Sequence, residues 1–172
     1  MGHHNPPPAT VLIGLRGSGK TTLGRLLAAR RSVPFIDLDD RTVAGSGHAS
    51  VSAFFRSAGE PAFRAAESLA LQAVLAAPGG AVIALGGGTP TAPGAAGRVR
   101  VVLLEAPPAV LGARLAAAPG DRPLLMGTDF AQEAALLGER RLPLYRSIAD
   151  AVVTTAGDAE ASVAAIEAVT PS

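Results

Sequence analysis

The sequence predicts a single α/β domain over about residues 9–170, with helices on both faces of a five-stranded parallel sheet in three layers. Short runs of β-branched and apolar residues alternate with longer segments of helical spacing. The connections are short, which favours parallel strands joined by helical crossovers. With 172 residues, 48% of them hydrophobic, the chain is large enough for one full core.

The first half of the chain contains two predicted strands and two predicted helices. Residues 9–13 are an apolar, β-branched strand, followed by a glycine-rich turn and a helix over 20–31 with apolar Leu23, Leu26 and Leu27. Residues 33–39 are predicted to be a second strand that ends in the carboxylates of Asp37 and Asp39. Residues 50–77 have helical spacing, with a break expected near Gly59.

The second half continues the alternation. Strands are predicted at 81–85, 98–104 and 151–154, and helices at about 108–117, 129–148 and 159–169. Pro143 is expected to kink or interrupt the second of these helices. Residues 45–50, 90–97 and 119–129 are least typical of packed core. A region of about residues 117–129 is therefore a candidate lid over a nucleotide.

Composition excludes several classes of protein. The formal net charge is +1, from 15 basic and 14 acidic residues, which argues against a dedicated binder of nucleic acid or anionic membrane. No cysteine is present, so disulfides and thiolate zinc sites are excluded. We expect a soluble, cytoplasmic protein whose residues 1–8, including His3 and His4, are a disordered tail or a cloning remnant.

The segment Gly14-Leu15-Arg16-Gly17-Ser18-Gly19-Lys20-Thr21 matches G-x-x-x-x-G-K-[ST], follows a predicted strand and opens a predicted helix. Backbone N–H groups of such a loop surround phosphates at a helix N-terminus. Lys20, the single lysine, is expected to reach the terminal phosphates, and the Thr21 hydroxyl to ligate Mg²⁺. The predicted ATP-binding residues are Gly17, Ser18, Gly19, Lys20, Thr21 and Thr22, together with Arg122 further along the chain.

Asp37 and Asp39 lie where a parallel strand is expected to end, and ligands bind at that edge of a parallel sheet. Asp37 could hold Mg²⁺ through water, and Asp39 could accept a hydrogen bond from an attacking hydroxyl. Asp40 is a third acidic candidate. The alternative is a solvated turn or a helix cap.

Two further motifs each allow a functional and a structural interpretation. Arg64 and Glu67 are three positions apart, so Glu67 could orient Arg64 toward a substrate carboxylate, or the two could form a surface ion pair. Gly86, Gly87 and Gly88 allow a ligand to approach the backbone closely, or form a plain turn.

Two arginine motifs follow. Arg122, in Asp121-Arg122-Pro123, could act as an arginine finger on the transferring phosphoryl group. The cluster of Arg140, Arg141 and Arg146 could stabilise a helix dipole or bind an anionic substrate.

Taken in this order, the motifs resemble those of the shikimate kinases, P-loop proteins of the nucleoside-monophosphate-kinase-like branch. The resemblance runs from about Val11 to about Val153 and implies the strand order 2-3-1-4-5. It also implies transfer of the γ-phosphate of ATP to the 3-hydroxyl of shikimate, in the pathway to aromatic amino acids. The implied partners are ATP and shikimate, with Mg²⁺ as cofactor, no nucleic acid, no membrane and a monomeric enzyme.

The resemblance implies a role for each matching residue. Lys20 and Arg122 are similar to the pair that stabilises the phosphoryl group, and Thr21 and Asp37 to the residues on the Mg²⁺ side. Asp39 resembles the carboxylate that contacts the substrate hydroxyls. The implied substrate site, within about residues 37–67 and beyond, consists of Asp39, Arg64, Gly86, Gly87, Gly88 and Arg141, supported by Glu67, Phe55 and Phe63.

The segment after Asp39 departs from the family pattern. Residues 40–48 are rich in glycine and lack the Glu that the family pattern has there, which predicts a looser flap over the substrate. His48, in this flap, is expected to be a solvated loop residue or a ligand contact. Ala84, two residues before the glycines, supplies no hydroxyl or carboxylate near the metal. Arg114 is the candidate for the arginine that the family places near the adenine of ATP. Two alternatives therefore stay open: a kinase of another small carboxylated polyol such as a sugar acid, and a non-catalytic nucleotide-binding homologue.

Overall fold

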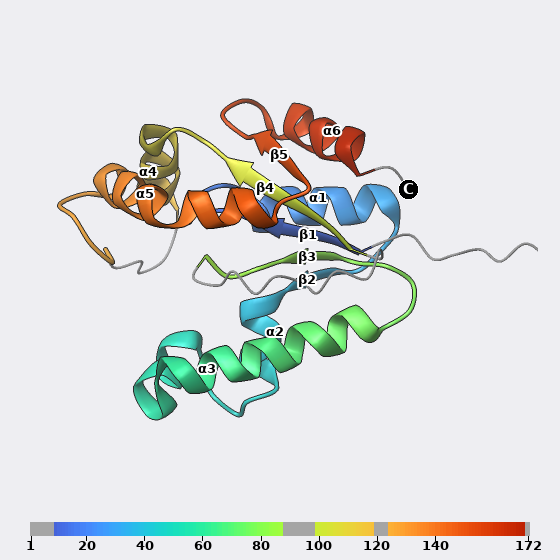
Figure 1. Ribbon diagram of the computed structural model, residues 1–172, viewed down its shortest axis with the longest axis vertical. Coiled ribbons are helices and arrows are strands. Elements are labelled where there is room, and N and C mark those ends of the chain that lie inside the picture. The colour runs from blue at the N-terminus through green and yellow to red at the C-terminus, as the bar shows by residue number, and fades with distance from the viewer. Residues whose placement is uncertain (1–8, 88–98, 119–123, 171–172) are drawn as a thin grey trace, which may run out of the picture.

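The computed structural model describes residues 9–87, 99–118 and 124–170, and the predictions for residues 1–8, 90–97, Gly88 and Arg122 lie outside them. Five parallel strands form one sheet in the order β2-β3-β1-β4-β5 (Figure 1), as the resemblance implies. The strands are β1 (Ala9–Ile13), β2 (Phe35–Asp37), β3 (Val82–Ala84), β4 (Val99–Glu105) and β5 (Ala151–Thr154). In register, Val11 lies opposite Ile83 on one side and Val101 on the other.

Helices cover both faces of this sheet, so the three-layer prediction is confirmed. They are α1 (Lys20–Arg31), α2 (Leu38–Ala44), α3 (Val51–Ala76), α4 (Pro108–Ala117), α5 (Phe130–Ile148) and α6 (Ala159–Val169). None of the helices in the described ranges is long and apolar enough to cross a membrane.

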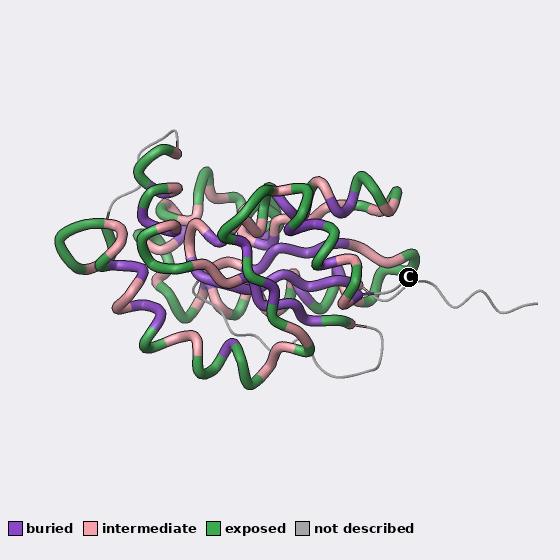
Figure 2. The backbone as a smooth tube through the Cα atoms, turned by 90° about the horizontal axis from the view of Figure 1, so that it is seen from above, coloured by how far each residue is buried: buried purple, intermediate pink, exposed green. Residues whose placement is uncertain are grey.

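Alternation along the strands divides the core into two parts. Val11 and Ile13 of β1 face one way and pack with buried residues of α3, α4 and α5, whereas Leu12 between them faces α1 and α6. Figure 2 shows the buried residues concentrated along the strands at the centre. Packing on both faces therefore fixes the position of the strands from which the following loops emerge.

The predicted strand over residues 33–39 is wrong at its end. β2 stops at Asp37, and Leu38 already begins α2, so the alternative interpretation of these carboxylates, a helix cap, applies to Asp37. Asp37 is its N-cap, because the Asp39 N–H donates to Asp37 Oδ1 at 3.2 Å. Asp39 therefore lies in the first turn of a helix. The glycine-rich segment begins only after Ala44.

Two expected breaks have different outcomes. Gly59 has φ 81° and separates two helical pieces within α3, as predicted. α5 is a single helix through Pro143, so the predicted interruption does not occur there. Leu137 and Tyr145, on either side of that proline, are both buried, and their packing offsets the hydrogen bond that proline cannot donate.

Candidate active site

The loop between β1 and α1 is packed so tightly that glycine is required. Gly14 has φ +148°, and a Cβ there would lie 2.5 Å from the carbonyl oxygen of Leu104 and 2.7 Å from Ser18 Oγ. Gly17 has φ +79° and leaves 2.9 Å to the carbonyl oxygen of Leu111. The neighbouring strand and α4 therefore fix the loop's backbone before any ligand binds.

Lys20 is the first residue of α1, and its side chain folds over this loop. Nζ donates to the carbonyl oxygens of Gly14 at 2.7 Å and Leu15 at 2.9 Å. Burial lowers the pKa of Lys20 to about 8, against the opposing attraction of Asp39 and Asp37. The ammonium is thus held where its charge is poorly solvated, which strengthens its interaction with an anion.

Thr21 and Asp37 lie together beside Lys20. Thr21 Oγ1 donates to Asp37 Oδ2 at 3.2 Å, although the two residues come from α1 and from the end of β2. Within the described ranges no group of three or more His, Cys, Asp or Glu side chains could hold a metal. One hydroxyl and one carboxylate instead suit Mg²⁺, which commonly takes one or two protein oxygens together with phosphates and water.

Asp39 is also close to Lys20 and lies against the chain that leaves β3. A Cβ placed on Gly86 would overlap the Oδ1 atom of Asp39, so glycine is what lets this carboxylate reach its position. Burial, followed by repulsion from Asp37 and Glu67, raises the pKa of Asp39 to about 6. A carboxylate with such a pKa can accept a proton near neutral pH.

These groups share one pocket of about 610 Å³. Its lining includes most residues that the sequence assigned to ATP, the metal and the acceptor: Gly17, Gly19, Lys20, Thr21, Thr22, Asp37, Asp39, Gly86 and Gly87. Ser18 is only 1% exposed and does not line the pocket. Its carbonyl oxygen instead accepts a hydrogen bond from Thr155 Oγ1 at 2.9 Å.

Arg64 is held by two glutamates on α3. Nη1 donates to Glu67 at 3.0 Å and Nη2 donates to Glu60 at 3.1 Å, while Glu67 is fully buried. The Arg64 guanidinium also lies over the rings of Phe55 and Phe63, at 5.9 and 5.5 Å. This pair is therefore no simple surface ion pair: a buried carboxylate orients a partly exposed guanidinium.

The arginines predicted near the end of α5 separate. Arg141 Nη1 and Tyr145 Oη both donate to the carbonyl oxygen of Gly87, the latter at 2.8 Å. Arg146 turns away to Glu105 at 2.8 Å, and Arg140 is exposed. Arg141 alone of the three thus reaches the glycine turn after β3.

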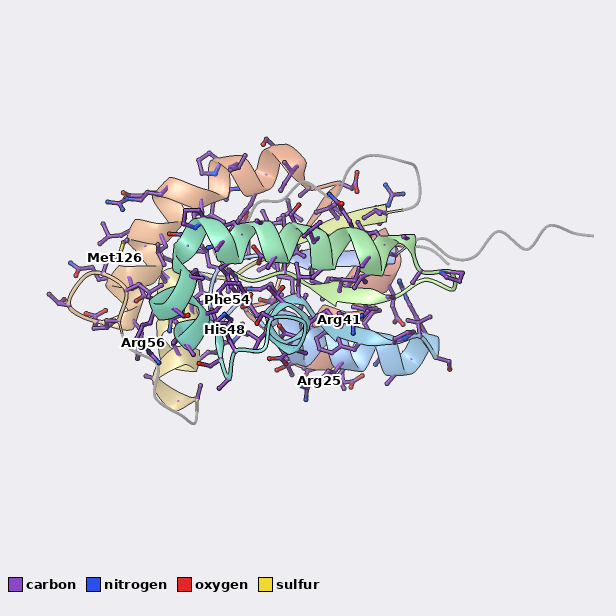
Figure 3. All side chains as sticks on the ribbon, turned by 90° about the horizontal axis from the view of Figure 1, so that it is seen from below. Arg25, Arg41, His48, Phe54, Arg56 and Met126 are labelled. Atoms are coloured by element: carbon purple, nitrogen blue, oxygen red, sulfur yellow. The ribbon has the colours of Figure 1, made fainter. Side chains whose placement is uncertain are left out.

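His48 is a partly exposed loop residue, as one of its two sequence interpretations has it. Its ring packs on Phe54 with centroids 4.4 Å apart (Figure 3), and it does not line the pocket. The contact closes residues 45–50 against the start of α3, so His48 has a packing role in this segment.

Thr155 is a pocket residue that sequence reasoning missed. It follows β5, and Arg114 of α4 donates to its backbone carbonyl and, at 3.3 Å, to its Oγ1. Arg114 also donates to the carbonyl oxygen of Gly17 at 3.3 Å, which places it against the phosphate loop. The position of Thr155 just after a parallel strand was the signal that could have identified it.

Comparisons with known proteins point to one family. The family model described as Shikimate kinase matches residues 16–170. The shikimate kinase of Saccharopolyspora erythraea is 40% identical over 156 residues, which cover 87% of this chain and 86% of that protein.

Solved structures agree. A shikimate kinase from Acinetobacter baumannii in complex with shikimate has a TM-score of 0.80 at 29% identity, covering 96% of this chain and 94% of that one. A shikimate kinase from Bacteroides thetaiotaomicron has a TM-score of 0.81 at 30% identity, covering 94% of this chain and 97% of that one. The likeness includes both the loop and the elements that surround it.

Proposed function

The chain belongs to the shikimate kinase family and is an ATP-dependent kinase that phosphorylates shikimate, and we propose that the pocket around Lys20 and Asp39 is its active site. The observation that carries this proposal is the placement of the two groups in one pocket, each in the other's electrostatic field. One binds a phosphate and the other receives a hydroxyl proton.

Phosphoryl transfer depends chiefly on alignment and on neutralising the charge of the transferring group. The Lys20 ammonium supplies positive charge at the terminal phosphates of ATP, and Arg122 is proposed to add a second. Asp39 accepts a hydrogen bond from the 3-hydroxyl of shikimate and takes its proton as the oxygen attacks the γ-phosphorus. The products are ADP and shikimate 3-phosphate.

Mg²⁺ is the proposed metal, held on the side of Thr21 and Asp37, whose oxygens lie 3.2 Å apart. When bound, it neutralises phosphate charge and holds the phosphates in line for transfer. Asp37 also repels Asp39, so the two carboxylates divide into a metal-side group and a proton acceptor.

Shikimate is proposed to bind between Asp39, the glycine turn and the guanidinium groups of Arg64 and Arg141. Gly86 to Gly88 allow the substrate ring to approach the backbone, and the two arginines match a carboxylate in shape and charge. Glu67 fixes the direction of Arg64, while Phe55 and Phe63 form an apolar wall beneath it.

Release of ADP with and without shikimate, in a coupled spectrophotometric assay, tests the function. Shikimate-dependent release is expected, with a higher kcat/KM for shikimate than for gluconate or other carboxylated polyols. ATP binding without turnover of any acceptor would contradict the proposed active site.

We further propose that the enzyme is a monomer and works in the cytoplasm, where ATP is supplied, without nucleic acid or membrane.

Arg64→Ala is expected to raise the KM for shikimate by about 10- to 100-fold, because a charge-assisted contact to the substrate carboxylate is lost. The KM for ATP is expected to stay near the wild-type value, since Arg64 does not line the phosphate pocket. Arg56→Ala is the matched control, because Arg56 is an exposed arginine on the same helix (Figure 3). Equal effects of the two substitutions on the KM for shikimate would contradict the assigned clamp.

The dependence of kcat/KM on pH follows from the two titrating groups. Asp39 must be ionised to accept a proton, so the rate is expected to rise with pH through the pKa of about 6. Lys20 must be protonated, so the rate is expected to fall through the pKa of about 8. A bell-shaped profile between these values, measured at saturating Mg²⁺, is the expected result, and a profile flat from pH 5.5 to pH 9 would rule out this pair.

A further inference from the structure

Glu133 is a buried carboxylate on the first full turn of α5, and none of the sequence motifs includes it. Its side chain is 1% exposed. Buried carboxylates are costly unless charge and hydrogen bonds compensate them. The N-terminal end of α5 supplies part of that compensation through the helix dipole.

Each carboxylate oxygen of Glu133 contacts a different segment of the chain. Oε1 accepts from Arg16 Nη1 at 2.9 Å, across 117 positions of sequence. Oε2 accepts from the backbone N–H of Leu125 at 2.5 Å. One side chain therefore joins the phosphate loop, α5 and the chain around Leu125.

Arg16 brings this linkage to the active site. It lies in the phosphate loop and lines the same pocket as Lys20 and Asp39, with 22% of its side chain exposed. A Cβ on Gly87 would lie 3.5 Å from Arg16 Cγ, so the arginine stem packs against the glycine turn. Arg16 thus separates the loop that binds the phosphate donor from the turn proposed to line the acceptor site.

We propose that Glu133 is a positioning residue for phosphoryl transfer, acting through Arg16. By holding the Arg16 guanidinium against α5, it fixes the wall between the donor and acceptor sites. The inference rests on the active site proposed above. A displacement of the donor relative to the acceptor lowers the rate of the bound complex more than it weakens binding of either substrate.

Glu133→Gln separates the two contacts of this residue. The side-chain oxygen of glutamine can still accept a hydrogen bond from the N–H of Leu125. Its NH₂ group then faces the Arg16 guanidinium, and because both groups are donors, they cannot form a hydrogen bond. Arg16→Met keeps a stem of similar bulk and leaves the Glu133 carboxylate buried without this charge partner. The double variant Arg16→Met/Glu133→Gln removes both charges together.

The experiment measures kcat, both KM values and Tm for these three variants and for Arg16→Lys, with rates taken well below every Tm. Arg30→Met is the control, since Arg30 lies in the last turn of α1, forms an ion pair with Glu167 of α6 and does not line the pocket. Each single variant is expected to lower kcat about tenfold, with KM values within about threefold of wild type. The kcat of the double variant is expected to fall about tenfold, and not by the hundredfold product of the two single losses, because both changes remove the same interaction.

Thermal stability gives a second readout. Arg16→Met is expected to lower Tm, because the buried carboxylate of Glu133 loses its positively charged partner. The double variant is expected to recover the wild-type Tm, because it removes the buried charge as well. Arg16→Lys is expected to restore most of kcat. Multiplicative losses of kcat, or kcat within twofold of wild type in both single variants, would overturn the role of Glu133. Absence of shikimate-dependent turnover in the wild-type enzyme would instead contradict the proposed active site itself.

Discussion

Replacing Lys20 with methionine is expected to lower kcat/KM for ATP by about 10³-fold or more. Lys20 is the single lysine, and its Nζ lies over the loop that receives the phosphates. Methionine has a similar length and fills the same space without a charge. The loss should therefore come from charge neutralisation in the transition state, and kcat measured at saturating ATP should fall with it.

The fold should survive this substitution. Burial disfavours the charged form of Lys20, as the lowered pKa shows, so a neutral side chain removes an electrostatic cost while losing two hydrogen bonds. Circular dichroism and Tm should thus be close to wild type. Arg25→Met removes an exposed positive charge from the same helix and is expected to keep full activity. If Lys20→Met retained more than a tenth of wild-type kcat/KM, the loop would not be the phosphate site.

Local patterns explain why so much of the fold was predictable. The bounds of β1, α1, α4, β5 and α6 follow from apolar runs, helical spacing and the glycines or prolines between them. The phosphate loop is equally local, because glycines at its turning points dictate backbone that other residues rarely adopt. In such segments neighbouring residues carry the whole signal.

Long-range contacts account for what the sequence did not reveal. The end of β2 depends on Asp37, whose side chain caps α2 instead of extending the strand. The choice of Arg141 over Arg146 depends on the Gly87 carbonyl, 54 positions away from Arg141. Arg16 and Glu133 carry no spacing signal at all, because their pairing arises from the packing of α5 against the phosphate loop. Contacts of this kind are set by the assembled fold.

Asp39→Asn is the second substitution with a large expected effect, lowering kcat by about 10²- to 10⁴-fold. The amide has almost the shape of the carboxylate, so it fits in the same place against Gly86. A residue with a Cβ in place of Gly86 would overlap it. It can still accept a hydrogen bond from the shikimate hydroxyl, but it cannot take the proton. The KM for shikimate should therefore change much less than kcat. The rising limb of the pH profile near pH 6 should also disappear.

Stability should move in the opposite direction, which separates catalysis from misfolding. The pKa of Asp39 is raised from 3.8 to about 6 in the folded protein, so the native state holds more protons than the unfolded chain between these values. Stability of the wild type therefore falls as pH rises across that window, and remains lower above it. Asparagine has no charge to bury, so Asp39→Asn should melt higher than wild type above pH 6 and equally near pH 3.5.

Asp40→Asn is the control for this substitution, because Asp40 is exposed in the same helical turn and does not line the pocket. It is expected to leave kcat, KM and the pH profile unchanged. A loss of Tm in Asp39→Asn that parallels its loss of activity would mean that Asp39 is structural. The expected result is instead a raised Tm, a near-normal KM for shikimate and a very low kcat. Such a result would mean that the Asp39 carboxylate is kept buried and charged, at a cost in stability, because the reaction needs it to receive a proton.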